Sequence, residues 1–310
     1  MREIPALLAG LFDYAGLFPP ASGSLEDVLA SHAAYRAGTD AWMLGRLIVP
    51  VSQLPDMDRA GAALSMDDDA TAWRVSAIVG QDADGDGAVV EAFNGRPANR
   101  RLGEATVDTV ELRVGTAADL AAARTWATRG FAVFCETPAD DDLEANLDAI
   151  AGAGLHAKLR TGGAPGAVPA PAMVAAFLCG CAARGVAAKA TAGLHHALTG
   201  SHPASSDAGA PSTPALGYVN VVIAAGLAAA AGRAAARDSE IRTTVTQVLS
   251  MEALPVRDEH DKGGWQGPAG GDFEVRFEEL AVAGRTLILS IGTCSFEEPV
   301  AEARRVGLLP

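Results

Sequence analysis

The sequence has few of the features that mark disulfide-rich, membrane or dinucleotide-binding proteins. Its four cysteines show no C-x-x-C spacing, which favours free thiols over a disulfide framework or a zinc site. The longest apolar run, Val219–Gly232, is mostly alanine. A membrane span needs about 20 apolar residues, so this shorter run predicts a buried helix. The pattern G-x-G-x-x-G does not follow any predicted strand, which argues against a Rossmann-type sheet.

Positive charge is also scarce. The chain has 24 basic and 38 acidic residues, a formal net charge of −14. Such an acidic chain is a poor partner for nucleic acid or for an anionic membrane. The N-terminal stretch carries Asp13 and then the pair Pro19-Pro20, which does not resemble a signal peptide. We therefore expect a cytoplasmic protein that binds neither nucleic acid nor membrane.

Short apolar strands alternate with alanine-rich helices along the chain. This alternation predicts a parallel sheet, and 310 residues suit one (β/α)8 TIM-barrel domain of about 250 residues plus insertions, spanning 1–310. The eight predicted strands are Leu7–Asp13, Trp42–Pro50, Trp73–Gly80, Val107–Val114, Phe131–Thr137, His156–Thr161, Val186–Thr191 and Thr286–Gly292.

A long insertion, 198–285, separates predicted strands seven and eight. It holds a loop rich in Gly, Ser and Pro (Thr199–Pro214), helical stretches and a hairpin predicted over Phe273–Ile288. Loops of this length serve as lids or interface elements, and a tolerated surface insertion explains the sequence equally well. The insertion and the alanine-rich helices are also compatible with a homodimer.

Charged residues alternate with apolar ones on four consecutive predicted strands. Because side chains alternate across a strand, the apolar set facing the helices leaves six charged residues facing the barrel centre: Glu111, Arg113, Glu136, Lys158, Arg160 and Lys189. Two are acidic and four basic, a formal surplus of +2. This surplus predicts an anionic substrate, with Arg46, Arg113 or Arg160 holding its carboxylate or phosphate. A self-satisfied layer of ion pairs is the alternative.

Lysine is the rarest of the basic residues. Only Lys158, Lys189 and Lys262 occur, and two of the three lie on adjacent predicted strands. Arginine replaces lysine as a surface charge but cannot supply a deprotonated amine, because its pKa stays above about 12. A desolvated lysine beside another cation has a lowered pKa and becomes nucleophilic. The pattern favours a Schiff base with a carbonyl substrate.

Several segments resemble the deoxyribose-phosphate aldolase group of class I aldolases. Lys158-Leu-Arg-Thr-Gly-Gly is similar to the family segment whose lysine forms the Schiff base, and Gly185-Val-Ala-Ala-Lys189-Ala-Thr-Ala-Gly to the segment whose lysine tunes the first. Val107-Asp-Thr-Val-Glu111 resembles the strand with the catalytic acid. Phe134-Cys-Glu-Thr137 and Ile291-Gly-Thr-Cys-Ser295 are similar to further strand ends.

The resemblance implies a cofactor-independent, metal-free lyase in which Lys158 is the nucleophile and Lys189 lowers its pKa. Glu111, Glu136 and His195 are the predicted acids and bases. Predicted substrate contacts come from the three arginines and from Thr161, Gly162, Thr191 and Ser295. Arg160 and Leu194 depart from the family pattern, so a small carboxylate-bearing carbonyl compound is as good a prediction as a sugar phosphate.

Two other functions stay open at this point. One is a metal-assisted hydrolase or lyase that uses Glu136 and His195, with the lysines as substrate clamps. The other is a barrel that binds a small anion without catalysis. Cys294 is predicted to be a small packing residue. Asp13 or Tyr14 could reach the site from the first strand as an acid or base, and the alternative is that Tyr14 and Phe18 cap the barrel mouth.

Overall fold

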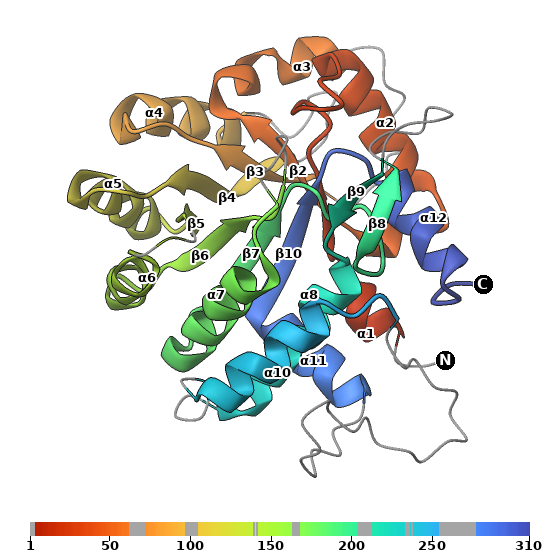
Figure 1. The fold of residues 1–310 in the computed structure, drawn as a ribbon. Helices are drawn as coiled ribbons and strands as arrows, with labels where there is room; N and C mark the ends of the chain where they lie inside the picture. The colour runs from red at the N-terminus through yellow and green to blue at the C-terminus, as the bar shows by residue number, and fades with distance from the viewer. Residues whose placement is uncertain are drawn as a thin grey trace.

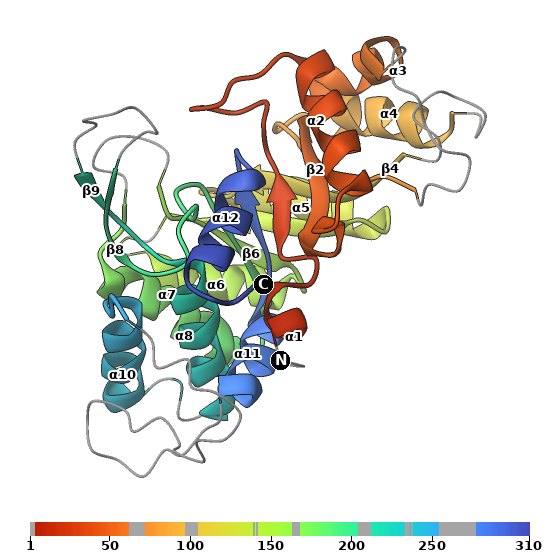
Figure 2. The ribbon, with the colours of Figure 1, turned by 90° about the vertical axis from the view of Figure 1, so that its right-hand side faces the viewer.

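The structure is a computed structural model. It describes residues 4–61, 72–96, 105–138, 140, 142–162, 168–203, 212–232, 236, 238–253 and 277–310. Lys262 and most of the C-terminal third of the predicted insertion lie outside these residues. Both termini lie on one side of the molecule, beside helices α1 (Ile4–Leu8) and α12 (Glu297–Arg305) (Figures 1 and 2).

Eight parallel strands form a closed barrel with helices around it, which confirms the predicted (β/α)8 fold (Figure 1). The order around the barrel is β1, β10, β7, β6, β5, β4, β3, β2, and β2 pairs back with β1. The strands are β1 (Phe12–Tyr14), β2 (Leu44–Pro50), β3 (Arg74–Ile78), β4 (Thr106–Arg113), β5 (Ala132–Glu136), β6 (His156–Arg160), β7 (Ala188–Thr191) and β10 (Ile288–Thr293).

Several helices between the strands begin or end at residues that cap a helix. Ser24 caps α2 through its side chain, and Thr116 and Asp119 form a capping box at α5, which satisfies backbone N–H groups that have no partner inside a helix. Helix α7 starts at Pro171 and stops at Gly185, whose φ of 66° is left-handed. These helices are α2 (Leu25–Ala37), α3 (Met57–Ala60), α4 (Ala83–Asn94), α5 (Ala117–Thr128), α6 (Leu143–Gly152) and α7 (Pro171–Arg184), with 3-10 turns η1 (Ala41–Met43) and η2 (Val51–Asp56).

Between β7 and β10 the chain forms a small hairpin and a group of helices. The hairpin pairs β8 (Gly200–Pro203) with β9 (Ser212–Ala215). The helices are α8 (Tyr218–Ala230), α10 (Ser239–Leu249) and α11 (Phe277–Leu287). The hairpin predicted over Phe273–Ile288 is therefore wrong for its described part, which is helical. Its apolar residues recur at helical spacing, and β10 begins only at Ile288.

Helices α8 and α11 pack backbone against backbone. A Cβ atom built on Gly226 would lie 2.1 Å from the carbonyl oxygen of Leu280, and one on Gly284 would lie 2.0 Å from that of Val222. Only glycine permits such an approach. The long apolar run of the sequence is helix α8, and ten or more of its residues are buried, as predicted. Among the described residues, no helix has the length and apolar character needed to cross a bilayer.

The first strand begins later than predicted. Leu7 and Leu8 belong to helix α1, a short helix at the bottom of the barrel, and β1 covers only Phe12–Tyr14. Leu7, Leu8 and Leu11 are fully buried, so the same apolar run serves either structure and periodicity cannot separate them.

Candidate active site

Polar side chains form one layer across the barrel, fixed by the register of its strands. Arg113 of β4 lies opposite Glu136 of β5, and Glu136 lies opposite Lys158 of β6. Lys158 in turn lies opposite Lys189 of β7, and Lys189 opposite Ser290 of β10. Neighbouring strands thus bring charged residues side by side, on the face that the alternation of apolar and charged residues predicts.

Lys189 lies in the barrel interior and has no exposed surface. Its ammonium group donates to Asp13 Oδ2 at 2.5 Å and to Glu111 Oε1 at 2.6 Å. Ser290 donates to Asp13 at 2.8 Å and Ser76 to Glu111 at 2.6 Å. A buried charge needs such partners, and each carboxylate here is held by at least one cation and one hydroxyl group.

Lys158 lies between the interior and the mouth of the barrel. Its Nζ atom is 2.9 Å from Glu111 Oε2 and 2.9 Å from Glu136 Oε2, and its side chain is 8% exposed. Glu111 is thus shared by both lysines, one at each carboxylate oxygen. Two amines from adjacent strands meet through one acid, and only Lys158 has a second acid on the open side.

The formal charge of this cluster differs from the prediction. Asp13, Glu111 and Glu136 bind the two lysines, so these five groups carry a formal charge of −1, and Glu136 also lies 3.6 Å from the exposed Arg113. The predicted surplus of +2 is wrong, because Asp13 joins from β1 and two arginines stay outside the interior. The arginines counted with the cluster do not enter the interior: the Arg113 side chain is 88% exposed, and Arg160 is exposed as well.

The carboxylates and the lysines of the cluster shift one another's pKa values. Burial raises the pKa of Glu111, but Lys158 and Lys189 outweigh it and bring that pKa well below its usual range. Burial lowers the pKa of Lys158, but Glu111 and Glu136 outweigh it and raise the pKa above its usual value. The net pKa of Lys158 is therefore raised where the sequence predicts a lowered one, so the amine is protonated.

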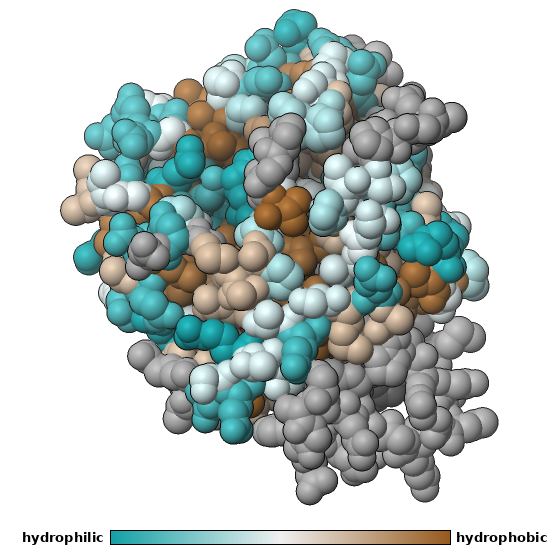
Figure 3. Space-filling model, in the orientation of Figure 1, coloured by the Kyte–Doolittle hydropathy of each residue, from teal (hydrophilic) through white to brown (hydrophobic). Residues whose placement is uncertain are grey.

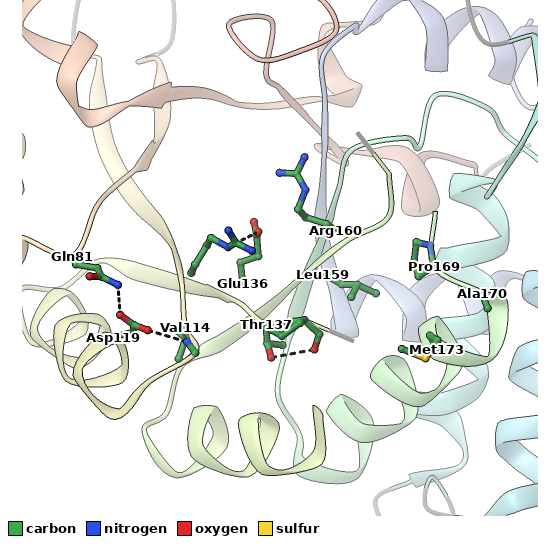
Figure 4. Close-up of a pocket in the computed structure, with 13 residues that line it drawn as sticks. Gln81, Val114, Asp119, Glu136, Thr137, Leu159, Arg160, Pro169, Ala170 and Met173 are labelled. Atoms are coloured by element: carbon green, nitrogen blue, oxygen red, sulfur yellow. Dashed lines mark hydrogen bonds and ion pairs between the residues drawn. The ribbon is translucent and has the colours of Figure 1, made fainter. Parts of the chain in front are cut away.

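A pocket opens at the carboxyl ends of β4, β5 and β6. Its volume is about 740 Å³, and its wall includes Arg113, Glu136 and Arg160. In the close-up, Glu136 and Arg160 lie centrally, Gln81 and Asp119 lie at one side, and Pro169, Ala170 and Met173 lie at the other (Figure 4). Barrel enzymes bind substrates at this end of their strands, and Glu136 belongs both to the pocket wall and to the Lys158 cluster.

The pocket has a polar and an apolar side. Gln81 donates to Asp119, and Asp119 accepts from the backbone of Gly115, so this acid is committed to the start of α5. Arg113 Nε lies 3.6 Å from Glu136. Met173, with 37% of its surface exposed, contributes to the apolar side. On the molecular face seen in Figure 3, hydrophobic side chains near the centre of the view are bordered by hydrophilic ones.

Arg46 is not part of this pocket. Its Nε lies 2.6 Å from Asp108 Oδ1, and Asp108 also pairs with Arg74. Register places these residues at the start of β2, β3 and β4, the end opposite the pocket. Only the backbone N–H of Arg46 reaches the cluster, where it donates to Asp13 at 2.7 Å. The prediction of Arg46 as a substrate contact is therefore not supported by its position.

The other predicted substrate contacts have structural duties. Thr161 donates to the carbonyl of Ala192 at 2.6 Å, and a Cβ on Gly162 would lie 2.9 Å from Gly193 Cα, so the ends of β6 and β7 pack tightly. Thr191 ends β7 and contacts Gly292. Ser295 Oγ accepts the backbone N–H of Glu298 at 3.2 Å at the start of α12. These residues shape the mouth of the barrel.

His195 follows β7 and contacts the end of β10. Its Nδ1 lies 2.7 Å from Glu298 Oε2, and its Nε2 lies 3.6 Å from Cys294 Sγ. His196 instead stacks on His202, with ring centroids 3.7 Å apart. Burial lowers the pKa of His195, but its hydrogen bonds to Cys294 and Glu298 outweigh burial and raise that pKa to about 9. Burial and the neighbouring His202 lower the pKa of His196.

The two adjacent histidines are therefore expected to titrate far apart. In an NMR titration, the ring protons of His195 should shift with a midpoint near pH 9, and those of His196 below the usual value of 6.5. Because the folded pKa of His195 is raised, its stabilising effect is complete below about pH 6.5 and is lost as the pH rises through about 9. His195→Gln should remove the upper titration and leave the lower; equal midpoints would contradict the assignment.

Sequence alone does not assign three members of the cluster. It leaves Asp13 open as an acid or base, and it makes no prediction for Ser76 and Ser290. A charged residue inside the apolar run Leu11-Phe12-Asp13 was the available signal, whereas a single serine in a strand gives none. In the described part of the chain, His, Cys, Asp and Glu do not gather in threes or more around a point that could hold a metal ion.

Comparison with models of protein families, with curated proteins and with solved structures gives no match to this chain.

Proposed function

We propose that the protein is a lyase of the class I aldolase type, in which Lys158 forms a Schiff base with a small anionic carbonyl compound. The observation that carries this proposal is the position of Lys158. Its amine lies between two carboxylates at 2.9 Å, with Glu136 on the wall of the pocket. Glu136 thus joins the amine to the pocket, and an amine nucleophile needs access to its substrate.

The two lysines have unequal positions, and the proposal gives them unequal roles. Lys189 has no exposed side chain and is fixed by Asp13 and Glu111, so it cannot meet a substrate. It holds Glu111, and Glu111 holds Lys158. Lys189 is thus a positioning residue and Lys158 the nucleophile.

The proton on Lys158 must leave before the amine can attack. Glu136 is the partner that also borders the pocket, so it accepts this proton. The free amine then adds to the carbonyl carbon. Glu136 returns the proton to the departing hydroxyl group, which leaves as water. The resulting iminium ion withdraws electrons from the carbon–carbon bond to be broken. Glu111 stays ionised beside the iminium ion, since its pKa is low.

The size and charge of the pocket define the substrate class. A volume of about 740 Å³ admits a small metabolite and is within the usual range for ligand sites, roughly 300–1,000 Å³. Arg113 and Arg160 line the wall, and guanidinium groups bind carboxylates and phosphates well. The substrate is therefore a short carbonyl compound with an acidic group.

Trapping the imine tests the proposal. The full-length protein is incubated with sodium cyanoborohydride and a panel of probes such as pyruvate, glyoxylate and glycolaldehyde phosphate, then digested and analysed by mass spectrometry. We expect a reduced adduct on the peptide that carries Lys158. Binding of the same compounds without any adduct, measured by calorimetry, would instead favour a barrel that only binds small anions.

Arg160 should determine affinity for the acidic end of the substrate. In Arg160→Met, we expect the probe concentration that gives half-maximal trapping to rise about tenfold, the loss typical of one charge-assisted hydrogen bond. Arg74→Met is a matched control, because Arg74 is equally an exposed strand arginine but lies at the opposite end of the barrel. An uncharged aldehyde should be trapped equally well by both variants. A similar loss for that aldehyde would contradict this role.

A further inference from the structure

The residues Cys294, His195 and Glu298 form a second cluster that the proposed lyase reaction does not use. It joins three segments: the loop after β7, the end of β10 and the first turn of α12. Glu298 Oε2 lies 2.7 Å from His195 Nδ1, and His195 Nε2 lies 3.6 Å from Cys294 Sγ. The order is acid, imidazole and thiol, and Thr293 Oγ1 also lies 3.4 Å from His195 Nδ1.

Cys294 differs from the other three cysteines of the chain. Cys135, Cys179 and Cys181 are fully buried, and burial raises the pKa of Cys135 to about 12 and that of Cys179 to about 11. These three are inert packing residues. Cys294 is partly exposed and contacts an imidazole that stays protonated to about pH 9. An imidazole in contact with a thiol can hold its proton during nucleophilic attack.

The surroundings complete the requirements of acyl transfer. The first turn of α12 supplies backbone N–H groups without partners inside the helix, and its positive end favours an anion. Burial, with Cys294 adding to it, raises the pKa of Tyr14, so its phenol stays neutral. Tyr14, Tyr35 and Phe296 form an aromatic group, with ring centroids 5.2 and 5.1 Å apart.

We infer that Cys294 is a nucleophile for acyl transfer, with His195 as its base and Glu298 as the residue that orients His195. The substrate class is an ester or thioester with an uncharged, apolar acyl group, because Tyr14 pairs with the end of β10, Phe296 follows Cys294 closely in the chain, and Glu298 adds negative charge. This inference is independent of the proposed lyase reaction at Lys158.

The steps balance without any oxidant or cofactor. The sulfur attacks the acyl carbon while its proton is held on His195 Nε2 as the imidazolium ion. The bond to the leaving alkoxide or thiolate breaks, and that group takes the proton from His195. Water then attacks the Cys294 thioester, with His195 accepting its proton, and releases a carboxylic acid and the free thiol.

Acylation with p-nitrophenyl acetate tests the inference. The full-length protein is quenched with acid after short intervals, and the acetylated peptides are identified by mass spectrometry. We expect the acetyl group on Cys294, formed about 100-fold more slowly in His195→Gln, as for the loss of a general base. Glu298→Gln should show a smaller loss. His196→Gln is the matched control, since His196 contacts His202 and Glu302 instead, and should acylate like the wild type.

The three buried cysteines report whether each variant is folded. Iodoacetamide should label Cys294 alone in the native protein and all four cysteines in urea. If His195→Gln exposes the buried thiols, the comparison of Glu298→Gln with His196→Gln decides. Acetylation elsewhere than Cys294, or equal rates in the folded His195→Gln or Glu298→Gln variant and the control, would overturn the inference.

Discussion

Replacing Lys158 by arginine should abolish the trapped adduct and lower any turnover by about 10³-fold or more, the scale of losing a covalent nucleophile. Arginine keeps the positive charge between Glu111 and Glu136, so the cluster stays paired. It cannot supply a free amine near neutral pH. The measurement is adduct yield by mass spectrometry, together with exchange of the α-hydrogens of pyruvate in D2O, which an iminium ion accelerates.

The comparison variants separate the chemistry from charge. Lys262→Arg is the matched control, since it changes the only other lysine outside the cluster, and it should leave adduct yield unchanged. Glu136→Gln keeps the amine but removes the proton acceptor at 2.9 Å. It should slow imine formation by about 10²-fold or more while the final adduct still maps to Lys158.

Two results would count against the reaction. Full exchange activity in folded Lys158→Arg would exclude the imine. An adduct that maps to Lys189 would reverse the roles, because that side chain has no exposed surface in the structure and would need a different barrel interior to meet a substrate.

The fold could be predicted from the chain because its signals are local and repeated. Each unit pairs a short apolar strand with a helix that has its own start or stop residue, such as Thr116, Pro171 or Gly185. Two elements could not be separated by such signals. Leu7 and Leu8 are buried in a helix where a strand was predicted, and the apolar spacing before β10 belongs to α11. Tertiary packing decides both.

The inward position of the lysines could also be predicted, because strand alternation fixes which face a residue occupies. Alternation does not show how far along the barrel axis a side chain lies or which residue it contacts. Arg113 and Arg160 have the same parity as the lysines but lie at strand ends, where the side chain turns to the pocket. Asp13 enters from a strand of three residues, too short to show a period. Asp13 adds a third carboxylate to the cluster through Lys189, whereas the pKa of Lys158 is raised by Glu111 and Glu136.

The same limit explains why the thiol cluster was missed. Cys294, His195 and Glu298 come from three segments, and only the closure of β10 against β7 brings them together. From sequence alone, His195 is predicted as a general acid or base and Cys294 as a packing residue, and no motif links them. The linkage is a property of barrel closure rather than of any motif.

Replacing Lys189 by methionine should destabilise the protein by about 3–5 kcal/mol, the usual cost of removing one partner from a buried ion pair. Asp13 and Glu111 are each 1% exposed and would keep their charge in the interior with one cation fewer. Equilibrium unfolding in urea, followed by circular dichroism, measures the loss. Lys158→Met should cost less, since Glu136 has an open side and Glu111 still retains Lys189.

The loss of stability in Lys189→Met should depend on pH and on the carboxylates that Lys189 pairs with, Glu111 and Asp13. The folded pKa of Glu111 lies below its usual 4.5, so the stability that its pairing contributes is present above about pH 4.5 and is lost as the pH falls further. Removing Lys189 takes away one of the cations that lower this pKa, so the difference from the wild type should shrink in acid. Adding Asp13→Asn to Lys189→Met removes an unpaired buried charge and should recover part of the loss. A double variant less stable than Lys189→Met alone at neutral pH would mean that Asp13 is held by Ser290 and the Arg46 backbone rather than by its pairing with Lys189.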